Sequence, residues 1–213
     1  MVTQLCEECE WLDASVRQAA FGVFDGHGGI WSAEWCASNL LRYVCGRPCF
    51  EQNPSLAMID GFEEADRALC AQAVQQNDRS GCCSLLATIK EHTLTLAHCG
   101  DCRAVLAFPS DPNDLDTLSV RALTEDHKPN VAAERERIEK AGGFVQLHVE
   151  PDMCALLRKS PAELAELQHS GGEKSLPSVT IARVQGTLSV SRAMCDTGFK
   201  ALKSTFFGQV SRA

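Results

Sequence analysis

The chain has 213 residues, of which 45% are apolar and 23% charged, and a formal net charge of −8. These proportions are those of an ordinary globular protein and predict one domain over residues 1–213. The negative charge and the lack of a Lys/Arg cluster argue against a nucleic acid as partner, because such binding depends on neutralising phosphates.

A membrane span and a secretory signal peptide each require an apolar run. No apolar run reaches the ~20 residues that span a bilayer, and the N-terminal stretch "MVTQLCEECEW" has no apolar signal region. We therefore expect no membrane partner and a cytoplasmic location, with the nucleus as an open alternative.

The first half of the chain alternates strand-like and helix-like patterns. Residues 21–24 read as a buried strand, and apolar residues at helical spacing over 30–45 and from Pro54 onward predict two packed helices, the second capped by Asn53. Three apolar runs follow, "SLLATIK", "TLTLAH" and "CRAVLAF". With turns at 91–92 and 100–101 between them, they predict an antiparallel meander.

The second half carries fewer regular patterns. A helix is predicted over residues 131–141, beginning at Asn130 and ending at two glycines. Residues 150–178 lack a strand pattern, with "PAELAELQ" as one helical piece and "HSGGEKSLP" as a loop. Strands with segregated helices predict an α+β fold with a central antiparallel β-sandwich, and a parallel doubly wound sheet is the weaker alternative.

Twelve cysteines are present, and in a reducing compartment they are expected to be free, mostly buried thiols. The Cys6/Cys9 and Cys99/Cys102 pairs have C-x-x-C spacing and could together supply four thiolates to zinc. Because the two pairs lie far apart in the chain, small core-filling residues are the preferred interpretation and a zinc module the alternative.

The stretch "FGVFDGHGG" holds the candidate site. Asp25 ends the apolar strand, and its carboxylate, with the Gly26 carbonyl, offers the hard oxygen ligands that Mg²⁺ or Mn²⁺ prefers. His27 could donate a proton to a leaving group beside such a metal. The alternative is a tight strand-to-helix turn in which Asp25 only caps the helix over residues 30–45.

Five motifs together resemble those of the metal-dependent type 2C protein serine/threonine phosphatases. They are, in order, "FGVFDGHGG", "GDCRAVL", "LTEDHKP", "ERIEKAGGFV" and "GTLSVSRAMCDTGFK". The resemblance is strongest over residues 20–149 and 179–200, and residues 150–178 look like an insertion. It implies a β-sandwich flanked by helices and hydrolysis of phosphoserine or phosphothreonine in protein substrates by a metal-activated water.

The resemblance also implies roles for individual residues. Asp25 would bridge two Mg²⁺ or Mn²⁺ ions, Gly26 would add its backbone carbonyl, and His27 would be the acid. Asp101 in "GDCRA" matches an aspartate assigned to a third, weaker metal site, with a hairpin-turn residue as the alternative. Matched positions that we interpret as structural are Asp126, His127, Lys128, Ser191 and Arg192.

The chain departs from the family pattern at both ends and once within a motif. The family's acidic ligands upstream of the DGH strand and late in the chain have no match, and Cys195 stands where the family usually has glycine. Asp60-Gly61 falls inside the second predicted helix and is rejected as a ligand. We therefore expect weak metal binding, a sandwich incomplete at its C-terminal end, and a chain that alone turns over little substrate and aggregates. The alternatives are an impaired relative that binds phosphoproteins or regulates a partner, and a fragment of a longer active enzyme.

Overall fold

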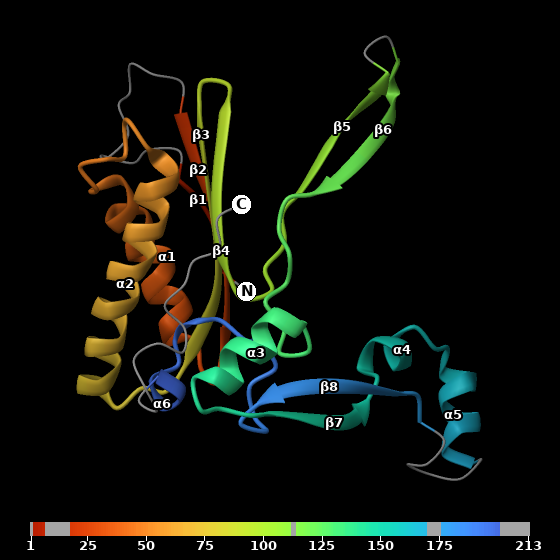
Figure 1. Cartoon of the computed structure of the whole chain (residues 1–213). Helices are drawn as coiled ribbons and strands as arrows, with labels where there is room; N and C mark the ends of the chain where they lie inside the picture. Colours follow the sequence, from red (N-terminus) through yellow and green to blue (C-terminus); the bar gives the residue numbers. More distant parts are fainter. Residues whose placement is uncertain (1, 7–17, 112–113, 170–175, 201–213) are drawn as a thin grey trace. The chain divides into compact units, whose positions relative to one another are not determined.

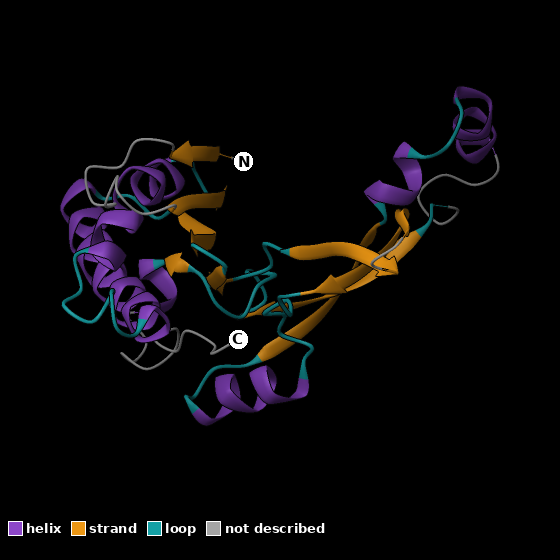
Figure 2. Ribbon diagram, turned by 90° about the horizontal axis from the view of Figure 1, so that it is seen from above, coloured by secondary structure: helices purple, strands orange, loops and turns teal. Residues whose placement is uncertain are grey.

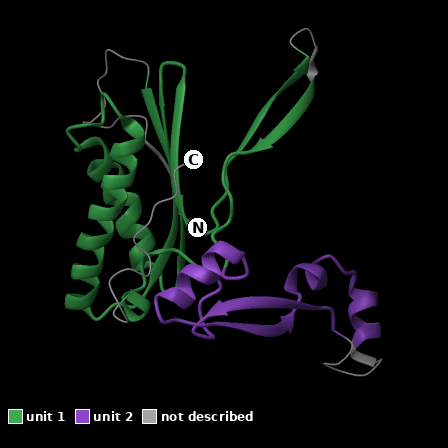
Figure 3. Ribbon diagram, viewed as in Figure 1, with its two compact units in different colours: residues 1–128, 190–213 green, residues 129–189 purple. Residues whose placement is uncertain are grey.

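The computed structural model describes residues 2–6, 18–111, 114–169 and 176–200. The chain forms two compact units, one of residues 1–128 with 190–213 and one of residues 129–189 (Figure 3). The described chain combines helices with antiparallel sheets (Figure 1), which confirms the predicted α+β class. The prediction that all of residues 1–213 make up a single domain stays a prediction.

The first unit contains a five-stranded antiparallel sheet. Its path is β1 (Val2–Cys6), β2 (Gln18–His27), β3 (Gly81–Lys90) and β4 (Thr93–Cys99), and β9 (Met194–Cys195) pairs with the first residues of β3. Along β2, Ala20, Gly22 and Phe24 are buried, whereas Phe21 and Asp25 are exposed. Because successive side chains of a strand point to opposite faces, β2 turns one face to the core and the other to solvent.

Two helices cover the core face of this sheet (Figure 2). They are α1 (Trp31–Cys45) and α2 (Pro54–Gln76), as predicted, and the Asn53 side chain accepts the Leu56 amide as the expected N-cap of α2. The helices approach closely at Gly61, where an added Cβ would lie 2.7 Å from the Val44 Cα. The buried core between sheet and helices includes Phe24, Leu40, Val44, Met58, Phe62, Leu69 and Leu86.

The predicted meander is correct for its first two strands and wrong for the third. Strand β5 (Val105–Asp111) pairs with β6 (Asp114–Ala122) in a separate two-stranded sheet and not with β4. The physical reason is that residues 100–104 bond to the segment after β6. The Leu123 amide donates a hydrogen bond to the Ala104 carbonyl, and the His127 amide donates one to the Gly100 carbonyl.

The second unit is built on a long two-stranded antiparallel ribbon. Strand β7 (Val145–Pro151) pairs with β8 (Ser178–Val184) along its whole length. Helix α3 (Ala132–Lys140) precedes the ribbon in the sequence. Helices α4 (Met153–Leu157) and α5 (Pro161–His169) belong to the segment that connects β7 to β8. The predictions of α3 and α5 are confirmed, although the N-cap of α3 is Val131 and not Asn130, and the loop "HSGGEKSLP" falls partly outside the described residues.

Candidate active site

The candidate site lies where β2 ends, on the sheet face opposite the helices. Asp25 and His27 are two residues apart in one strand, so their side chains share a face. Asp25 is exposed, and the His27 side chain is 31% exposed. The N-cap of α1 is Ile30 and has no side-chain cap, so the alternative in which Asp25 caps that helix is wrong.

The glycines of this motif are explained by backbone geometry. Gly28 and Gly29 have φ of +67° and +149°, which side chains rarely allow, and they form the turn between β2 and α1. An added Cβ at Gly26 would lie 3.0 Å from the Gly29 carbonyl oxygen and 3.1 Å from the Ala33 Cβ. Close helix packing therefore requires glycine at position 26, whatever its carbonyl binds.

His27 is held by a residue distant in the chain. Its Nε2 lies 2.9 Å and 3.0 Å from the two carboxylate oxygens of Asp196, whose side chain is only 3% exposed. Burial lowers the pKa of His27. The hydrogen bond to Asp196, the negative charge of Asp196 and the negative charge of Asp25 outweigh it and raise that pKa above the ordinary value. Asp101 adds a smaller contribution of the same sign. Three carboxylates therefore act on one imidazole.

Asp101 reaches the same end of the sheet from β4. Because Ser84 pairs with Cys99 and Asp25 pairs with Cys83, the residues after β4 lie beside Cys83, across β3 from Asp25. Gly100 has φ of +108°, and an added Cβ there would lie 2.4 Å from the Cys83 Sγ. The chain then diverges into its bonds with residues 123–127, so Asp101 is not the predicted alternative, a residue of a β4–β5 hairpin turn.

Lys128 donates a hydrogen bond to the Asp101 carboxylate. Burial raises the pKa of Asp101, but Lys128 and a hydrogen bond from Cys83 lower it below the ordinary value overall. Asp101 is therefore an ionised carboxylate that already has a cationic partner.

Among the matched residues that we interpret as structural, Asp126, His127 and Ser191 contact neighbouring segments of the chain. Arg103 donates two hydrogen bonds of 2.7 Å to Asp126, and the His127 Nδ1 accepts the Gly100 amide at 3.1 Å. The His127 ring stacks on that of His98 with centroids 4.4 Å apart, and Ser191 donates its amide to the His127 carbonyl. These contacts fix the segment from which Lys128 reaches Asp101.

The described donors fit a divalent cation in kind but not in number. Carboxylates from Asp25 and Asp101 and the Gly26 carbonyl are hard oxygen ligands, of which Mg²⁺ takes six, including water. Within the described ranges, no group of three or more His, Cys, Asp or Glu is placed to hold a metal. For the zinc alternative, Cys99 and Cys102 are buried free thiols, and Cys9 lies outside the described residues.

The sequence did not predict that Asp196 contacts His27 or that Lys128 contacts Asp101. Asp196 ends "SRAMCD", a motif that we used only to recognise the family, and Lys128 was interpreted as structural. A signal existed in both cases, because a polar residue in a motif shared with an enzyme family is a candidate for contact with its site.

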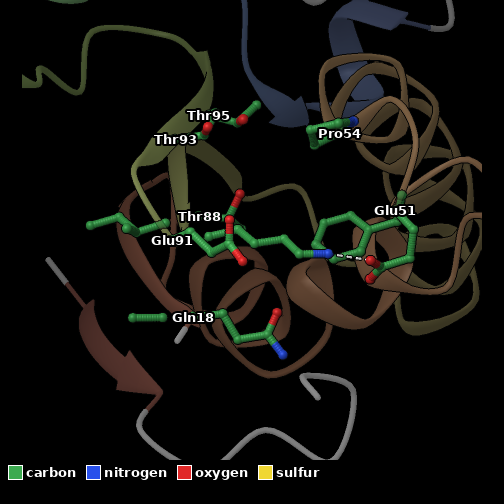
Figure 4. A pocket seen from close by; sticks show the side chains of 11 residues that line it. Gln18, Glu51, Pro54, Thr88, Glu91, Thr93 and Thr95 are labelled. Atoms are coloured by element: carbon green, nitrogen blue, oxygen red, sulfur yellow. Dashed lines mark hydrogen bonds and ion pairs between the residues drawn. The ribbon is translucent and has the colours of Figure 1, made fainter. Parts of the chain in front are cut away.

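A pocket of about 320 Å³ lies at the opposite end of the same sheet (Figure 4). It is lined by the beginning of β2, the end of β3, the beginning of β4 and residues 50, 51 and 54, and the Lys90–Glu51 ion pair is part of its lining. Gln18 lines this pocket, whereas His27 ends the same strand. The pocket is therefore separate from the candidate site.

Among the described helices, none combines the length and apolar character required to cross a bilayer.

Comparison with known proteins places the chain in a family. Residues 3–153 match the family model of protein phosphatase 2C. "Protein phosphatase 2C homolog 2" of Saccharomyces cerevisiae is 38% identical over 186 residues, which cover 86% of this chain and 31% of that protein. "Probable protein phosphatase 2C 2" of Arabidopsis thaliana is 36% identical over 192 residues, or 89% of this chain and 40% of that protein. The chain thus spans less than half the length of these curated relatives.

Solved structures share the fold of this chain. A serine-threonine phosphatase 2C from Toxoplasma gondii superimposes with a TM-score of 0.67 and 21% identity, covering 97% of this chain and 66% of that one. A C. elegans sex determining protein gives a TM-score of 0.60 and 22% identity, over 89% of this chain and 38% of that one. On the match of residues 3–153, this chain belongs to the protein phosphatase 2C family.

Proposed function

We propose that this chain contributes catalytic residues to a metal-dependent protein serine/threonine phosphatase, which hydrolyses phosphoserine and phosphothreonine in protein substrates. The observation that carries the proposal is the placement of Asp25 and His27 on one face of β2. Asp101 lies at the same end of the sheet. Membership of the phosphatase 2C family supports it. In this proposal both compact units are parts of one phosphatase domain, with residues 150–178 as an insertion.

The metal would be held by oxygen atoms. Asp25 and the Gly26 carbonyl are the proposed ligands for Mg²⁺ or Mn²⁺, and Asp101 is the proposed ligand of a weaker site. When bound, the ions would supply an activated water and positive charge that stabilises the transition state. Because Asp101 is paired with Lys128, a cation there has to compete with an ammonium group, which is in keeping with weak binding.

His27 has the proposed role of general acid. A serine or threonine alkoxide is a poor leaving group and needs a proton as its bond to phosphorus breaks. The imidazole carries that proton more readily because the surrounding carboxylates favour its charged form. Its 31% exposed side chain can reach a substrate oxygen at the surface.

The metal assignment is tested by the substitution Asp25→Asn, which removes a ligand charge with little change in volume. We expect Mn²⁺ affinity, measured by calorimetry on the purified chain, to fall at least tenfold. Asp60→Asn is the matched control because it alters the other Asp-Gly of the chain, inside α2. Equal Mn²⁺ affinity in Asp25→Asn and the wild type would contradict the assignment of Asp25.

The acid role is tested by His27→Ala with two leaving groups. In a completed version of the chain that is active with Mn²⁺, we expect a loss of roughly 10²–10⁴ in turnover of a phosphothreonine peptide, and a smaller loss on p-nitrophenyl phosphate. Equal losses on both substrates would argue against proton donation. Binding of the phosphopeptide without any turnover would instead favour the non-catalytic alternative, a phosphoprotein-binding or regulatory module.

A further inference from the structure

We propose that Asp196 is a positioning residue for His27, which holds the imidazole by Nε2 and leaves Nδ1 to transfer the proton. This inference rests on the acid role proposed for His27. Its first support is the contact itself, in which both carboxylate oxygens of Asp196 lie within 3.0 Å of Nε2. A carboxylate accepts only, so the neutral imidazole bonded to it carries its proton on Nε2.

The second support is the sheet register, which builds the contact from three strands. Gly81 in β3 pairs with His27 of β2 on one side and with Cys195 of β9 on the other. Asp196 follows Cys195 directly, so its carboxylate and the imidazole meet above Gly81. An added Cβ at Gly81 would lie 2.3 Å from both the Asp196 Oδ1 and the His27 Nε2. The contact therefore needs glycine at position 81.

The third support is the backbone that delivers Asp196. Cys195 and Asp196 have φ of +65° and +52°, a left-handed conformation that is uncommon for residues other than glycine. The Cys195 amide donates to the Asp66 carboxylate at 2.8 Å, and the Asp196 amide donates to the Ser80 carbonyl at 3.4 Å. Strained backbone that is held in this way often serves a site, and here it sets the direction of the Asp196 side chain.

Helix capping is the simplest other role for Asp196, because α6 (Thr197–Lys200) begins at the next residue. The amides of Phe199 and Lys200, however, donate to the backbone carbonyl of Asp196. Both side-chain oxygens are directed at His27 instead. The Asp196 carboxylate therefore bonds to the His27 imidazole, and the Asp196 backbone carbonyl bonds to the amides of α6.

The tautomer of His27 tests the proposal without any need for turnover. Long-range ¹H–¹⁵N spectra of the purified chain, with the His27 signals identified by their loss in His27→Gln, should give an Nε2–H tautomer for the neutral ring. In Asp196→Asn and in Gly81→Ala we expect the population of that tautomer to fall. Gly81→Ala keeps both partners but separates them, and Gly198→Ala is its control because an added Cβ there meets nothing within 4 Å.

Kinetics provides the second readout. In the same active version of the chain, Asp196→Asn should slow Mn²⁺-dependent turnover of a phosphothreonine peptide about 10–100-fold, the range for residues that orient a ligand at a metal site, and should slow p-nitrophenyl phosphate turnover less. In the His27→Ala background the same substitution should cause no further loss. A purely structural Asp196 would slow both substrates equally and would add to the loss in that background.

The outcomes separate this inference from the proposed function. A wild-type Nδ1–H tautomer, or an Asp196→Asn variant with unchanged tautomer and unchanged peptide turnover, would overturn the positioning role even if His27 is the acid. Conversely, if His27→Ala shows no dependence on the leaving group while Asp196→Asn still alters the tautomer, the acid role fails and the Asp196–His27 contact stands.

Discussion

The helix-covered sheet and the β5–β6 hairpin are built from similarly apolar strands but bury very different parts of them. In the covered sheet, Phe24 and Leu86 are 3% and 2% exposed, whereas Val105 and Val120 in the hairpin are 65% and 68% exposed. One hairpin face, formed by Val105, Ala107 and Pro109 opposite Ala122, Val120 and Leu118, is apolar throughout. The comparison shows that an apolar strand pattern predicts a strand but not what covers it.

The largest expected effect lies in the core between the sheet and its covering helices. Phe62 in α2 is 1% exposed and packs within the main core, so Phe62→Ala leaves a cavity and should lower the free energy of unfolding by about 3–5 kcal/mol. Val120→Ala in the hairpin is the comparison variant and should change it by less than about 0.5 kcal/mol. Denaturant unfolding measures both. Similar losses would show that the hairpin is as well packed as the core.

A smaller effect is expected at the contact between α1 and α2. Gly61→Ala places a methyl group 2.7 Å from the Val44 Cα, and the overpacking outweighs the higher helix propensity of alanine. We expect a net loss of about 1–2 kcal/mol in the same unfolding measurement. Gly198→Ala, with open space around the added Cβ, should be neutral, and a stabilised Gly61→Ala variant would contradict the close approach of the two helices.

The base of the hairpin should respond to pH. Arg103, just before β5, donates two hydrogen bonds to Asp126, and this contact lowers the pKa of Asp126 below the ordinary 3.8. A carboxyl whose pKa is lower in the folded state contributes stability above its unfolded pKa and loses that contribution as the pH falls through the folded pKa. Asp126 should therefore support the hairpin at about pH 5 and lose this effect progressively below about pH 4.

Hydrogen exchange of the β5–β6 amides, corrected for the intrinsic rate, measures this effect. Protection in the wild type should exceed that in Asp126→Asn near neutral pH, and the difference should vanish in acid. A difference that persists at low pH would mean that Asp126 acts by packing and not by its charge.

The smallest change in stability is expected from the exposed hairpin face. Val105→Thr with Val120→Thr should alter the free energy of unfolding by less than about 0.5 kcal/mol, because both side chains are largely exposed. Self-association of the purified chain, followed by light scattering, should nevertheless fall, since exposed apolar faces and strand edges favour it. Unchanged scattering would show that another surface drives association.

Local patterns determined much of this protein. The 3.6-residue periodicity over 30–45 and after Pro54 predicted α1 and α2, since a helix closes its hydrogen bonds within its own segment. The Asn53 cap was also predicted, because a capping side chain bonds to a backbone amide only a few residues away. In the candidate site, "FGVFDGHGG" was enough to put Asp25 and His27 at the end of a strand, and the motifs together were enough to recognise the family.

Tertiary structure decided which distant segments meet. Strand β5 has the pattern of a third meander strand, but it pairs with the next strand, β6, because residues 100 and 104 bond to residues 127 and 123 and the chain leaves the first sheet there. The same holds for the contact in the site. Asp196 lies 169 residues after His27, and only the pairing of β2, β3 and β9 across Gly81 brings its carboxylate to the imidazole.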